Sequence, residues 1–162
     1  MRPIRFLLLV IVLIFTNNAM SAQGNEAVAQ NTLQSNDLDF FNKQTNQPVK
    51  VKLWYLSGDA NCGTTVCLVE SQNKRKIALI SHGAFGSPIE MNWLGYALAS
   101  QGWLVVGVAH YGESWVYGKK TIDPSVLARF WQRPEEVSFT LEQLTNKGLF
   151  NLNIDTNNVL ML

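Results

Sequence analysis

Two apolar segments flank a single helical segment in the middle of this chain, and together they define its fold class. Residues 76–81 (KIALIS) and 103–108 (WLVVGV) are nearly all apolar, which is typical of strands covered on both faces. Between them a helical pattern runs from Pro88 to Gln101, and Gly102 follows as its cap. Two buried strands joined by one helix form a right-handed βαβ unit. The sequence therefore predicts an α/β fold with a mostly parallel sheet flanked by helices.

Three further strands and a second helix are predicted around this unit. Apolar and polar residues alternate over 49–55, which indicates a half-buried strand that is antiparallel or lies at an edge. Residues 65–70 and 159–162 are shorter β-rich runs. A second helix begins at Pro134, carries acidic residues in its first turn and ends at Gly148. Its predicted inner face consists of Val137, Leu141 and Leu144.

Between residues 110 and 132 the regular pattern gives way to aromatic side chains among glycine, lysine and proline. This excursion follows the carboxyl end of a buried strand, where α/β proteins build binding pockets. Within it, Asp123 and Pro124 favour the start of a short helix that reaches Trp131. A surface loop covered by its own aromatic residues is the alternative, and the sequence leaves both interpretations open.

The first 22 residues have the order of a secretory signal peptide. A short basic stretch is followed by an apolar run, Phe6–Phe15, and then by small residues before Gln23. A transmembrane helix needs roughly 20 apolar residues, so this run is too short to span a bilayer. We therefore expect residues 1–22 to be removed and the protein to be periplasmic or secreted, with no stable membrane span afterwards. An uncleaved anchor is the alternative.

A polar segment separates the predicted signal from the predicted domain. Residues 23–47 are rich in Asn and Gln and show little periodicity, so we expect a flexible leader in which only Leu38–Phe41 docks on the domain. The domain itself is expected to span residues 48–162. The formal net charge of +1 gives no reason to expect nucleic acid as a partner, which leaves a small molecule.

The two cysteines, Cys62 and Cys67, lie in a turn that contains glycine and threonine. In an oxidising compartment a single local disulfide is the expected state, and two free thiols are the alternative. We expect no metal here, because a zinc site needs further His or Cys ligands and none lies nearby.

The turn that follows the first fully apolar strand reads SHGAFG, residues 81–86. A buried strand that stops at a histidine and two glycines is either an ordinary tight turn or a turn that exposes backbone N–H groups for chemistry. Glycine permits backbone conformations that such a turn requires. The surrounding motifs decide between the two interpretations.

Five motifs occur in an order and spacing shared with a known family: LWY at 53–55, SHGAFG at 81–86, LASQGWLVVGVAHYG at 98–112, RPEEV at 133–137 and NVLML at 158–162. On these motifs the sequence resembles the amino-terminal half of an α/β-hydrolase, in the group of dienelactone hydrolases and platelet-activating factor acetylhydrolases. It departs from the group's pattern at Leu56, where proline is usual, and at Ala109, where aspartate is usual. Glu135 and Glu136 can supply the acidic residue that follows Arg-Pro.

The resemblance implies a role for the SHGAFG turn. In such hydrolases the loop after the third strand contributes backbone N–H groups to the oxyanion hole, which stabilises the charged oxygen of the tetrahedral intermediate. The donor residues implied here are Ala84 and Phe85. The residues implied to support the loop are His82, Gly83 and Gly86. His110 at its strand end and Arg133, as an ion-pair or capping residue, are interpreted as structural.

The residues that complete a hydrolase site are not found in this sequence. The fold places the nucleophile in a Gly-x-Ser-x-Gly elbow after the fifth strand, followed by the acid and the base. No such elbow occurs, with Ser or with Cys, so we expect nucleophile, acid and base beyond Leu162 and no catalytic residue within this chain. Ser81, Ser87 and Ser114 are not nominated as nucleophiles, because no base is expected beside them.

Two functional hypotheses remain. In the first, the chain is part of an exported serine-type hydrolase that acts on small esters or lactones without a metal or an organic cofactor, and these 162 residues alone are inactive. In the second, the chain is a non-catalytic, hydrolase-like binding module. A dinucleotide-binding half is not favoured, because no Gly-x-Gly-x-x-Gly follows a strand.

Overall fold

The structure is a computed structural model, and it describes residues 31–162. The predicted signal peptide, residues 1–22, and residues 23–30 of the predicted leader lie outside the described residues. In the described part of the chain, no helix is both long and apolar enough to cross a membrane.

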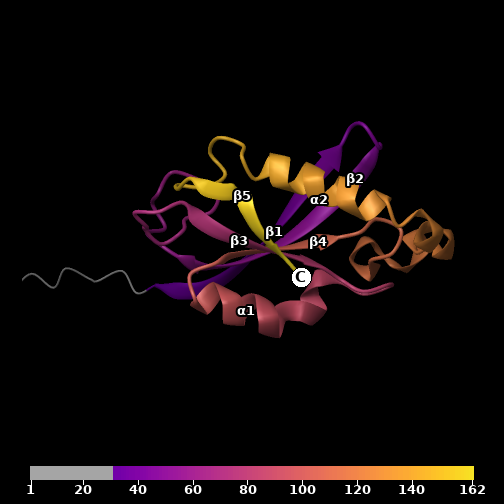
Figure 1. The fold of residues 1–162 in the computed structure, drawn as a ribbon, viewed down its shortest axis with the longest axis horizontal. Helices are drawn as coiled ribbons and strands as arrows, with labels where there is room; N and C mark the ends of the chain where they lie inside the picture. The colour runs from indigo at the N-terminus through magenta and orange to yellow at the C-terminus, as the bar shows by residue number, and fades with distance from the viewer. Residues whose placement is uncertain (1–30) are drawn as a thin grey trace, which may run out of the picture.

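One mixed sheet of five strands runs through the centre of the molecule (Figure 1). The strand order is β1-β2-β4-β3-β5. β3 runs parallel to both of its neighbours, β4 and β5, whereas β2 is antiparallel to β1 and to β4. The predicted α/β class with a parallel βαβ unit is therefore confirmed. The strands span Thr32–Asn42 (β1), Gln47–Ser57 (β2), Arg75–Ser81 (β3), Leu104–Ala109 (β4) and Ile154–Met161 (β5).

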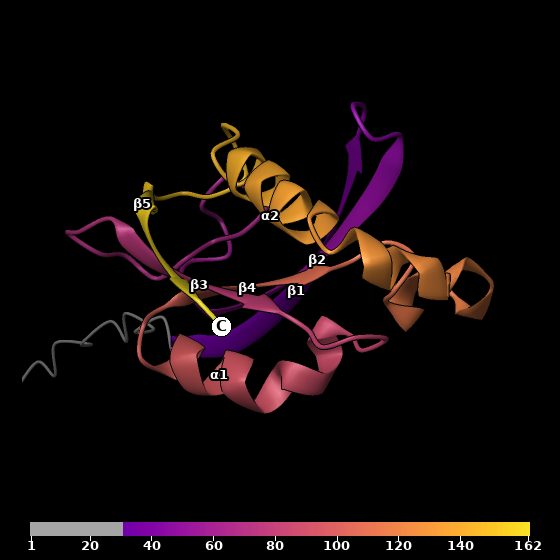
Figure 2. The same ribbon diagram turned by 45° about the vertical axis from the view of Figure 1, so that its right-hand side comes forward.

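Two helices cover opposite faces of this sheet (Figure 2). Helix α1, Asn92–Ser100, joins β3 to β4 and packs on one face, and α2, Gln132–Gln143, packs on the other. The larger core lies beneath α2 and the smaller one beneath α1. The α2-side core includes Val49, Val51, Leu53, Ile77, Leu79, Val106 and Leu144, and the α1-side core includes Trp54, Ala78, Ile80, Ala99 and Val105.

Trp54 shows why β2 is more deeply buried than its alternating sequence predicts. Its indole is fully buried beneath α1, and its Nε1 donates to Asn92 Oδ1 at 3.0 Å. A Cβ atom on Gly95 would lie 2.4 Å from the Trp54 ring, so only glycine allows α1 to approach this closely. The prediction of a half-buried strand was wrong for this position, because α1 covers the second face.

The amino-terminal part of the described chain differs from the prediction. Instead of a flexible leader up to residue 47, residues Thr32–Asn42 form β1, which pairs along its whole length with β2. Leu38 and Phe40 pack against the α2-side core, while the intervening polar side chains face solvent. An edge strand of an antiparallel hairpin needs only one apolar face, so a polar composition is compatible with it.

The predicted strand over 65–70 is also not formed. Only two isolated bridges occur there, Ser57 with Leu68 and Val66 with Phe150. Cys62 and Cys67 form a disulfide with a Cα–Cα distance of 5.7 Å, which closes the turn. The backbone of Leu68 bonds to the side-chain amide of Asn151, at 2.8 and 2.9 Å, rather than to a neighbouring strand. The segment is therefore a disulfide-closed loop.

The predicted helices form, but their bounds differ: α2 begins at Gln132 and ends at Gln143, before the predicted end at Gly148. The stretch from Pro88 begins as a 3₁₀ helix, Pro88–Met91, capped by Ser87, before α1 follows. The stretch that begins at Pro124 is a 3₁₀ helix, Pro124–Arg129, capped by Asp123. On α2 the predicted Leu144 is buried, but so are Glu136 and Thr140, which were not expected on the inner face. The buried Glu136 contacts His110 at the end of β4, where the candidate site lies.

Candidate functional site

The SHGAFG turn lies at the carboxyl ends of β3 and β4, where two parallel strands end side by side. Ser81 is the last residue of β3, and His110 follows the last residue of β4. The amino-terminal part of α2 packs over this edge through Arg133 and Glu136. Three segments that are distant in sequence therefore meet at the edge where α/β proteins bind ligands.

The carbonyl of Gly83 fixes the geometry of the turn. Its oxygen accepts from the backbone N–H of Gly86 at 3.0 Å and lies 2.7 Å from His82 Nδ1. The trans peptide that joins Gly83 to Ala84 is planar, so its N–H points away from the fixed carbonyl. Within residues 31–162, neither the N–H of Ala84 nor that of Phe85 forms a hydrogen bond. Both N–H groups can therefore donate to a ligand oxygen.

Two further features keep the turn tight. Phe85 has φ of 59°, a left-handed conformation that is unfavourable for a side chain of this size. A Cβ atom on Gly86 would lie 3.1 Å from the Gly83 oxygen and 2.9 Å from Glu90 Oε2, so a side chain there would crowd the fixed carbonyl. Strain of this kind persists only where the surrounding structure holds the backbone in place.

His82 is buried beneath the turn, and its hydrogen bonds fix which ring nitrogen carries the proton. Its Nε2 accepts from the backbone N–H of His110 at 3.1 Å, so the ring proton resides on Nδ1 and is donated to the Gly83 oxygen. Burial, reinforced by the nearby His110 and Arg133, lowers the pKa of His82. The imidazole is thus neutral and its lone pair is occupied. His82 orients the loop and is not placed to act as a base.

His110 lies between a hydroxyl and a carboxylate. Its Nε2 is 2.8 Å from Ser81 Oγ, and its Nδ1 is 2.6 Å from Glu136 Oε2. The second carboxylate oxygen, Glu136 Oε1, accepts from the backbone N–H of Tyr111 at 3.1 Å. The expectation that no base lies beside Ser81 was wrong, because a serine and a histidine 29 residues apart meet across two strand ends.

A second charged contact ties α2 to the same turn. Arg133 donates through Nε to Glu113 Oε1 at 3.1 Å, through Nη2 to Glu113 Oε2, and through Nη1 to the His82 carbonyl at 3.0 Å. The hydrogen bonds from Arg133 hold the pKa of the buried Glu113 carboxyl below its usual value. Arg133 thus forms the ion pair expected of it, and its partner is Glu113, a residue that the sequence analysis did not single out.

The aromatic excursion is anchored beside the turn. Trp115 Nε1 donates to Glu90 Oε1 at 3.1 Å, and the other oxygen of Glu90 lies against Gly86. The Tyr117 hydroxyl accepts from the backbone N–H of Lys50 at 2.7 Å and donates to the Ala109 carbonyl at 2.9 Å. Burial raises the pKa of Tyr117, so its hydroxyl remains a donor. These bonds fix where the excursion leaves the sheet.

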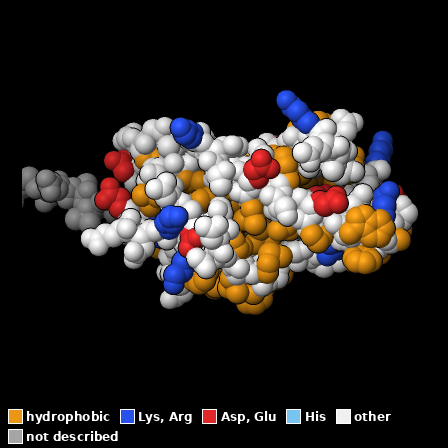
Figure 3. All heavy atoms as spheres, turned by 45° about the horizontal axis from the view of Figure 1, so that its top comes forward, with side chains coloured by type: hydrophobic (Ala, Val, Ile, Leu, Met, Phe, Trp, Pro, Cys, Tyr) orange, Lys and Arg blue, Asp and Glu red, His pale blue; other side chains and the backbone are white. Residues whose placement is uncertain are grey.

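Several large apolar side chains of this region face solvent. Hydrophobic side chains gather at the right-hand end of the molecule in Figure 3, where Figure 1 places the excursion. Phe85 in the turn is 41% exposed and Trp115 is 43% exposed. Phe130 and Trp131 are exposed too, and their rings contact each other edge to face. A binding pocket in the excursion therefore stays a prediction, beside the alternative of a surface loop covered by its own aromatic residues.

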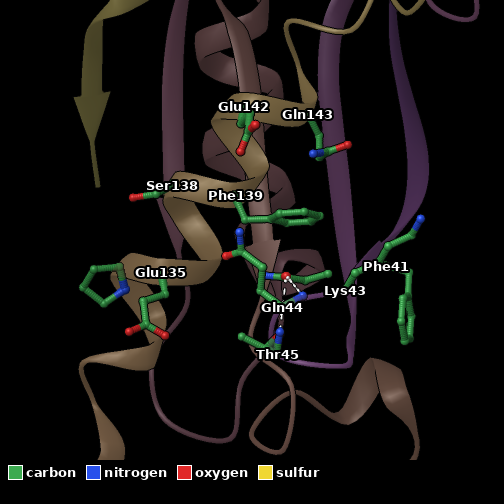
Figure 4. A pocket seen from close by; sticks show the side chains of 11 residues that line it. Phe41, Lys43, Gln44, Thr45, Glu135, Ser138, Phe139, Glu142 and Gln143 are labelled. Atoms are coloured by element: carbon green, nitrogen blue, oxygen red, sulfur yellow. Dashed lines mark hydrogen bonds between the residues drawn. The ribbon is translucent and has the colours of Figure 1, made fainter.

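A separate hollow lies between α2 and the β1–β2 turn (Figure 4). It is an open groove of about 660 Å³, and Phe139 and Glu142 of α2 face Phe41 and Gln44 across it. The groove is lined by none of the residues of the SHGAFG turn and contains no histidine or cysteine. It is therefore separate from the residues that meet at the carboxyl ends of β3 and β4. Among residues 31–162 there is also no group of three His, Cys, Asp or Glu side chains that could hold a metal ion.

Comparison with solved structures identifies the fold. A ferulic acid esterase from Streptomyces cinnamoneus superimposes with a TM-score of 0.58 at 19% identity, over 83% of this chain and 52% of the esterase. The fold is that of the α/β-hydrolases. A carboxylesterase-like protein from Lactobacillus plantarum gives a TM-score of 0.49 at 13% identity, over 80% of this chain and 44% of its own. No protein-family model and no curated protein sequence matches this chain. The chain spans about half the length of the esterase that shares its α/β-hydrolase fold.

Proposed function

We propose that this chain is the amino-terminal part of an exported serine-type hydrolase that cleaves carboxylic esters or lactones, in the dienelactone hydrolase and platelet-activating factor acetylhydrolase group. The observation that carries the proposal is the SHGAFG turn. Its Gly83 carbonyl is held by two bonds, while the N–H groups of Ala84 and Phe85 have no hydrogen-bond partner among residues 31–162. An oxyanion hole requires fixed main-chain donors of this kind.

The end of β5 lies directly beside this turn. The backbone N–H of Leu162 donates to the Leu79 carbonyl at 2.9 Å, and the Leu162 carbonyl accepts from the N–H of Ser81 at 2.9 Å. A nucleophile a few residues after Leu162 would thus emerge next to Ala84. In the α/β-hydrolase fold this position carries the strand-to-helix elbow of the nucleophile.

The proposed chemistry assigns one task to this part of the protein. When a hydroxyl nucleophile attacks the ester carbonyl, the electron pair of the C=O bond moves to oxygen and leaves it negatively charged. The N–H groups of Ala84 and Phe85 donate to that oxygen and stabilise the tetrahedral intermediate. The base expected beyond Leu162 takes the proton of the hydroxyl and returns it to the leaving oxygen, so that the intermediate collapses and expels the alcohol. The same base then deprotonates the water that hydrolyses the acyl-enzyme to the acid. No metal or organic cofactor takes part in this scheme.

The substrate and the location of the protein belong to the same proposal. The structural neighbour with the same fold is an esterase whose name specifies ferulic acid, which supports an ester as substrate. The low net charge supports a small molecule over nucleic acid. Removal of residues 1–22 and export to the periplasm or medium remain predictions from the basic, apolar and small residues at the amino terminus.

The decisive test is the coding sequence beyond Leu162 together with an assay of the protein that it encodes. We expect a Gly-x-Ser-x-Gly within a few codons and hydrolysis of p-nitrophenyl acetate by the extended protein. Ala84→Pro removes one donor N–H and should lower kcat by about 10²–10³-fold, whereas the control Ala84→Gly keeps the N–H. Near-UV circular dichroism establishes that both variants fold. Saturable turnover by residues 1–162 alone would contradict the proposal.

A further inference from the structure

Both carboxylate oxygens of Glu136 accept hydrogen bonds from the two residues that follow β4, His110 and Tyr111. Oε2 lies 2.6 Å from the His110 ring, and Oε1 accepts from the N–H of Tyr111 at 3.1 Å. The side chain is buried on the inner face of α2. A buried carboxylate is costly unless it is hydrogen-bonded, so its two acceptors hold the end of β4 in a defined position.

The carboxylate also decides where the ring proton of His110 lies. An ionised carboxylate can only accept, so His110 Nδ1 carries the proton and donates it to Glu136. His110 Nε2 is then an acceptor, and the Ser81 hydroxyl at 2.8 Å donates to it. The hydrogen bonds therefore run in one direction, from Ser81 through His110 to Glu136.

The same segment is connected to the proposed oxyanion donor. The backbone N–H of His110 donates to His82 Nε2, and His82 Nδ1 donates to the Gly83 oxygen. That oxygen belongs to the peptide whose N–H is contributed by Ala84. Each step is a direct hydrogen bond between side chain and backbone, so a displacement of His110 changes the orientation of the Ala84 N–H.

Arg133 supports the turn from the same face of α2. It lies three positions before Glu136, so both side chains project from one side of the helix. Arg133 Nη1 donates to the carbonyl of His82, the residue whose ring holds the Gly83 oxygen. Of these two α2 side chains, Arg133 acts on the turn directly and Glu136 acts on it through His110 and His82.

The geometry points to Glu136 as a positioning residue for the oxyanion hole, acting through the tautomer of His110 and the link from His110 to His82. This inference rests on the proposed ester hydrolase function for its consequence in catalysis, but the link itself can be measured without activity. It assigns Ser81 to the hydrogen-bonded link, not to a nucleophile.

Glu136→Gln is the informative variant because it preserves shape and reverses one hydrogen bond. The glutamine amide can keep its oxygen on the Tyr111 N–H while its NH₂ donates to His110 Nδ1. His110 would then carry its proton on Nε2, and Ser81 would have to accept instead of donate. The matched control is Glu135→Gln, which removes an exposed carboxylate one position earlier on the same helix.

Long-range ¹H–¹⁵N NMR can read this directly, because the sequence contains only two histidines. In the unmodified protein we expect both rings to carry their proton on Nδ1. In Glu136→Gln we expect His110 to change to the Nε2–H form, with His82 unchanged. We also expect hydrogen exchange at the Gly86 amide to accelerate by up to about tenfold, because a shift of His110 weakens the hold of His82 on the Gly83 oxygen by an amount comparable to one hydrogen bond. Glu135→Gln should leave all of these signals in place.

Three results would overturn the inference. The first is an Nε2–H tautomer of His110 in the unmodified protein, a measurement that needs no variant to fold. The second is an equal response to Glu136→Gln and Glu135→Gln. The third is labelling of Ser81 by a fluorophosphonate probe, found by peptide mass spectrometry, because a reactive Ser81 would be a nucleophile. If the extended protein proves to have no esterase activity while the tautomers are as expected, the proposed function fails and the positioning link stands.

Discussion

Two sets of ion pairs among residues 31–162, one on the β1–β2 hairpin and one at the SHGAFG turn, differ in the burial of their carboxylates. On the β1–β2 hairpin, Lys50 contacts Asp39 at 2.9 Å and Lys52 contacts Asp37 at 3.1 Å. At the turn, Arg133 contacts Glu113 at 3.1 Å. The hairpin carboxylates are 74% and 76% exposed, whereas that of Glu113 is only 4% exposed.

The difference shows what each set of charges contributes. Exposed pairs compete with water and salt, so the hairpin pairs contribute little to stability and instead give the edge strand β1 a charged surface that discourages pairing with another chain. A buried carboxylate that loses its partner cannot be solvated by water. Glu113 therefore favours only folded states in which Arg133 lies beside it. Arg133 in turn holds the His82 carbonyl in place.

The largest expected effect is on stability, in Arg133→Met. The variant keeps most of the apolar stem but leaves Glu113 buried without its cation. We expect the free energy of unfolding to fall by about 3 kcal/mol, the lower end for a broken buried pair, because Arg133 itself is 25% exposed. Urea denaturation measures it. Arg129→Met is the matched control, since Arg129 contacts the exposed Asp123 at 3.5 Å, and equal losses in the two variants would remove the distinction between the regions.

An effect of intermediate size is expected from pH. The pKa of His82 is lowered in the folded state from its usual 6.5, so the unfolded chain binds more protons below that pH. The free energy of unfolding should therefore be fully maintained above pH 6.5 and should decrease as pH falls below it. Glu113, whose folded pKa is also lowered, adds a second decrease below its usual 4.5.

Urea midpoints across pH 4–8 test this assignment. In His82→Gln the decrease that begins near pH 6.5 should disappear, while the decrease from Glu113 at lower pH should remain. Asp39→Asn on the hairpin should leave both decreases unchanged, because its carboxylate is exposed. A pH profile of His82→Gln identical to that of the unmodified protein would show that His82 does not hold the proposed neutral state.

The smallest effect is expected in Lys52→Gln. The lysine contacts an exposed aspartate, and such pairs contribute about 0.2–1 kcal/mol. We expect a change in the free energy of unfolding of no more than about 0.5 kcal/mol, and a smaller change in 0.5 M salt. If Lys52→Gln lowered the free energy of unfolding as much as Arg133→Met, burial would not explain the difference between the hairpin and the turn.

The parallel unit could be predicted from the sequence, whereas β1 could not. Residues 76–81 and 103–108 are apolar on both faces, and that pattern belongs to central parallel strands. β1 is rich in Asn, Gln and Asp, and its signal was limited to the alternation of Leu38 and Phe40. β1 is stabilised by pairing with β2. The residues of β1 alone do not predict that pairing.

The turn could be located from the sequence, but the side chains that hold it could not all be named. The contact of Glu136 with His110 joins residues 26 positions apart, and nothing in either local pattern specifies it. One signal was present: Glu136, Thr140 and Leu144 are spaced by four and share a helical face. Because Leu144 was placed on the inner face, Glu136 had to point inward as well.

The position of β3 in the sheet also affects how the protein is made. Both strands that flank it, β4 and β5, are synthesised after it, and β5 begins only at Ile154. During translation the two edges of β3 therefore remain unpaired until β4 and β5 have been made. Exposed apolar strands of this kind associate with other nascent chains. The exposed basic residues Lys74 and Lys76 stand at its start. We expect them to act as gatekeepers in that interval, so that their replacement by neutral residues lowers the yield of soluble protein more than it lowers the stability of the folded one.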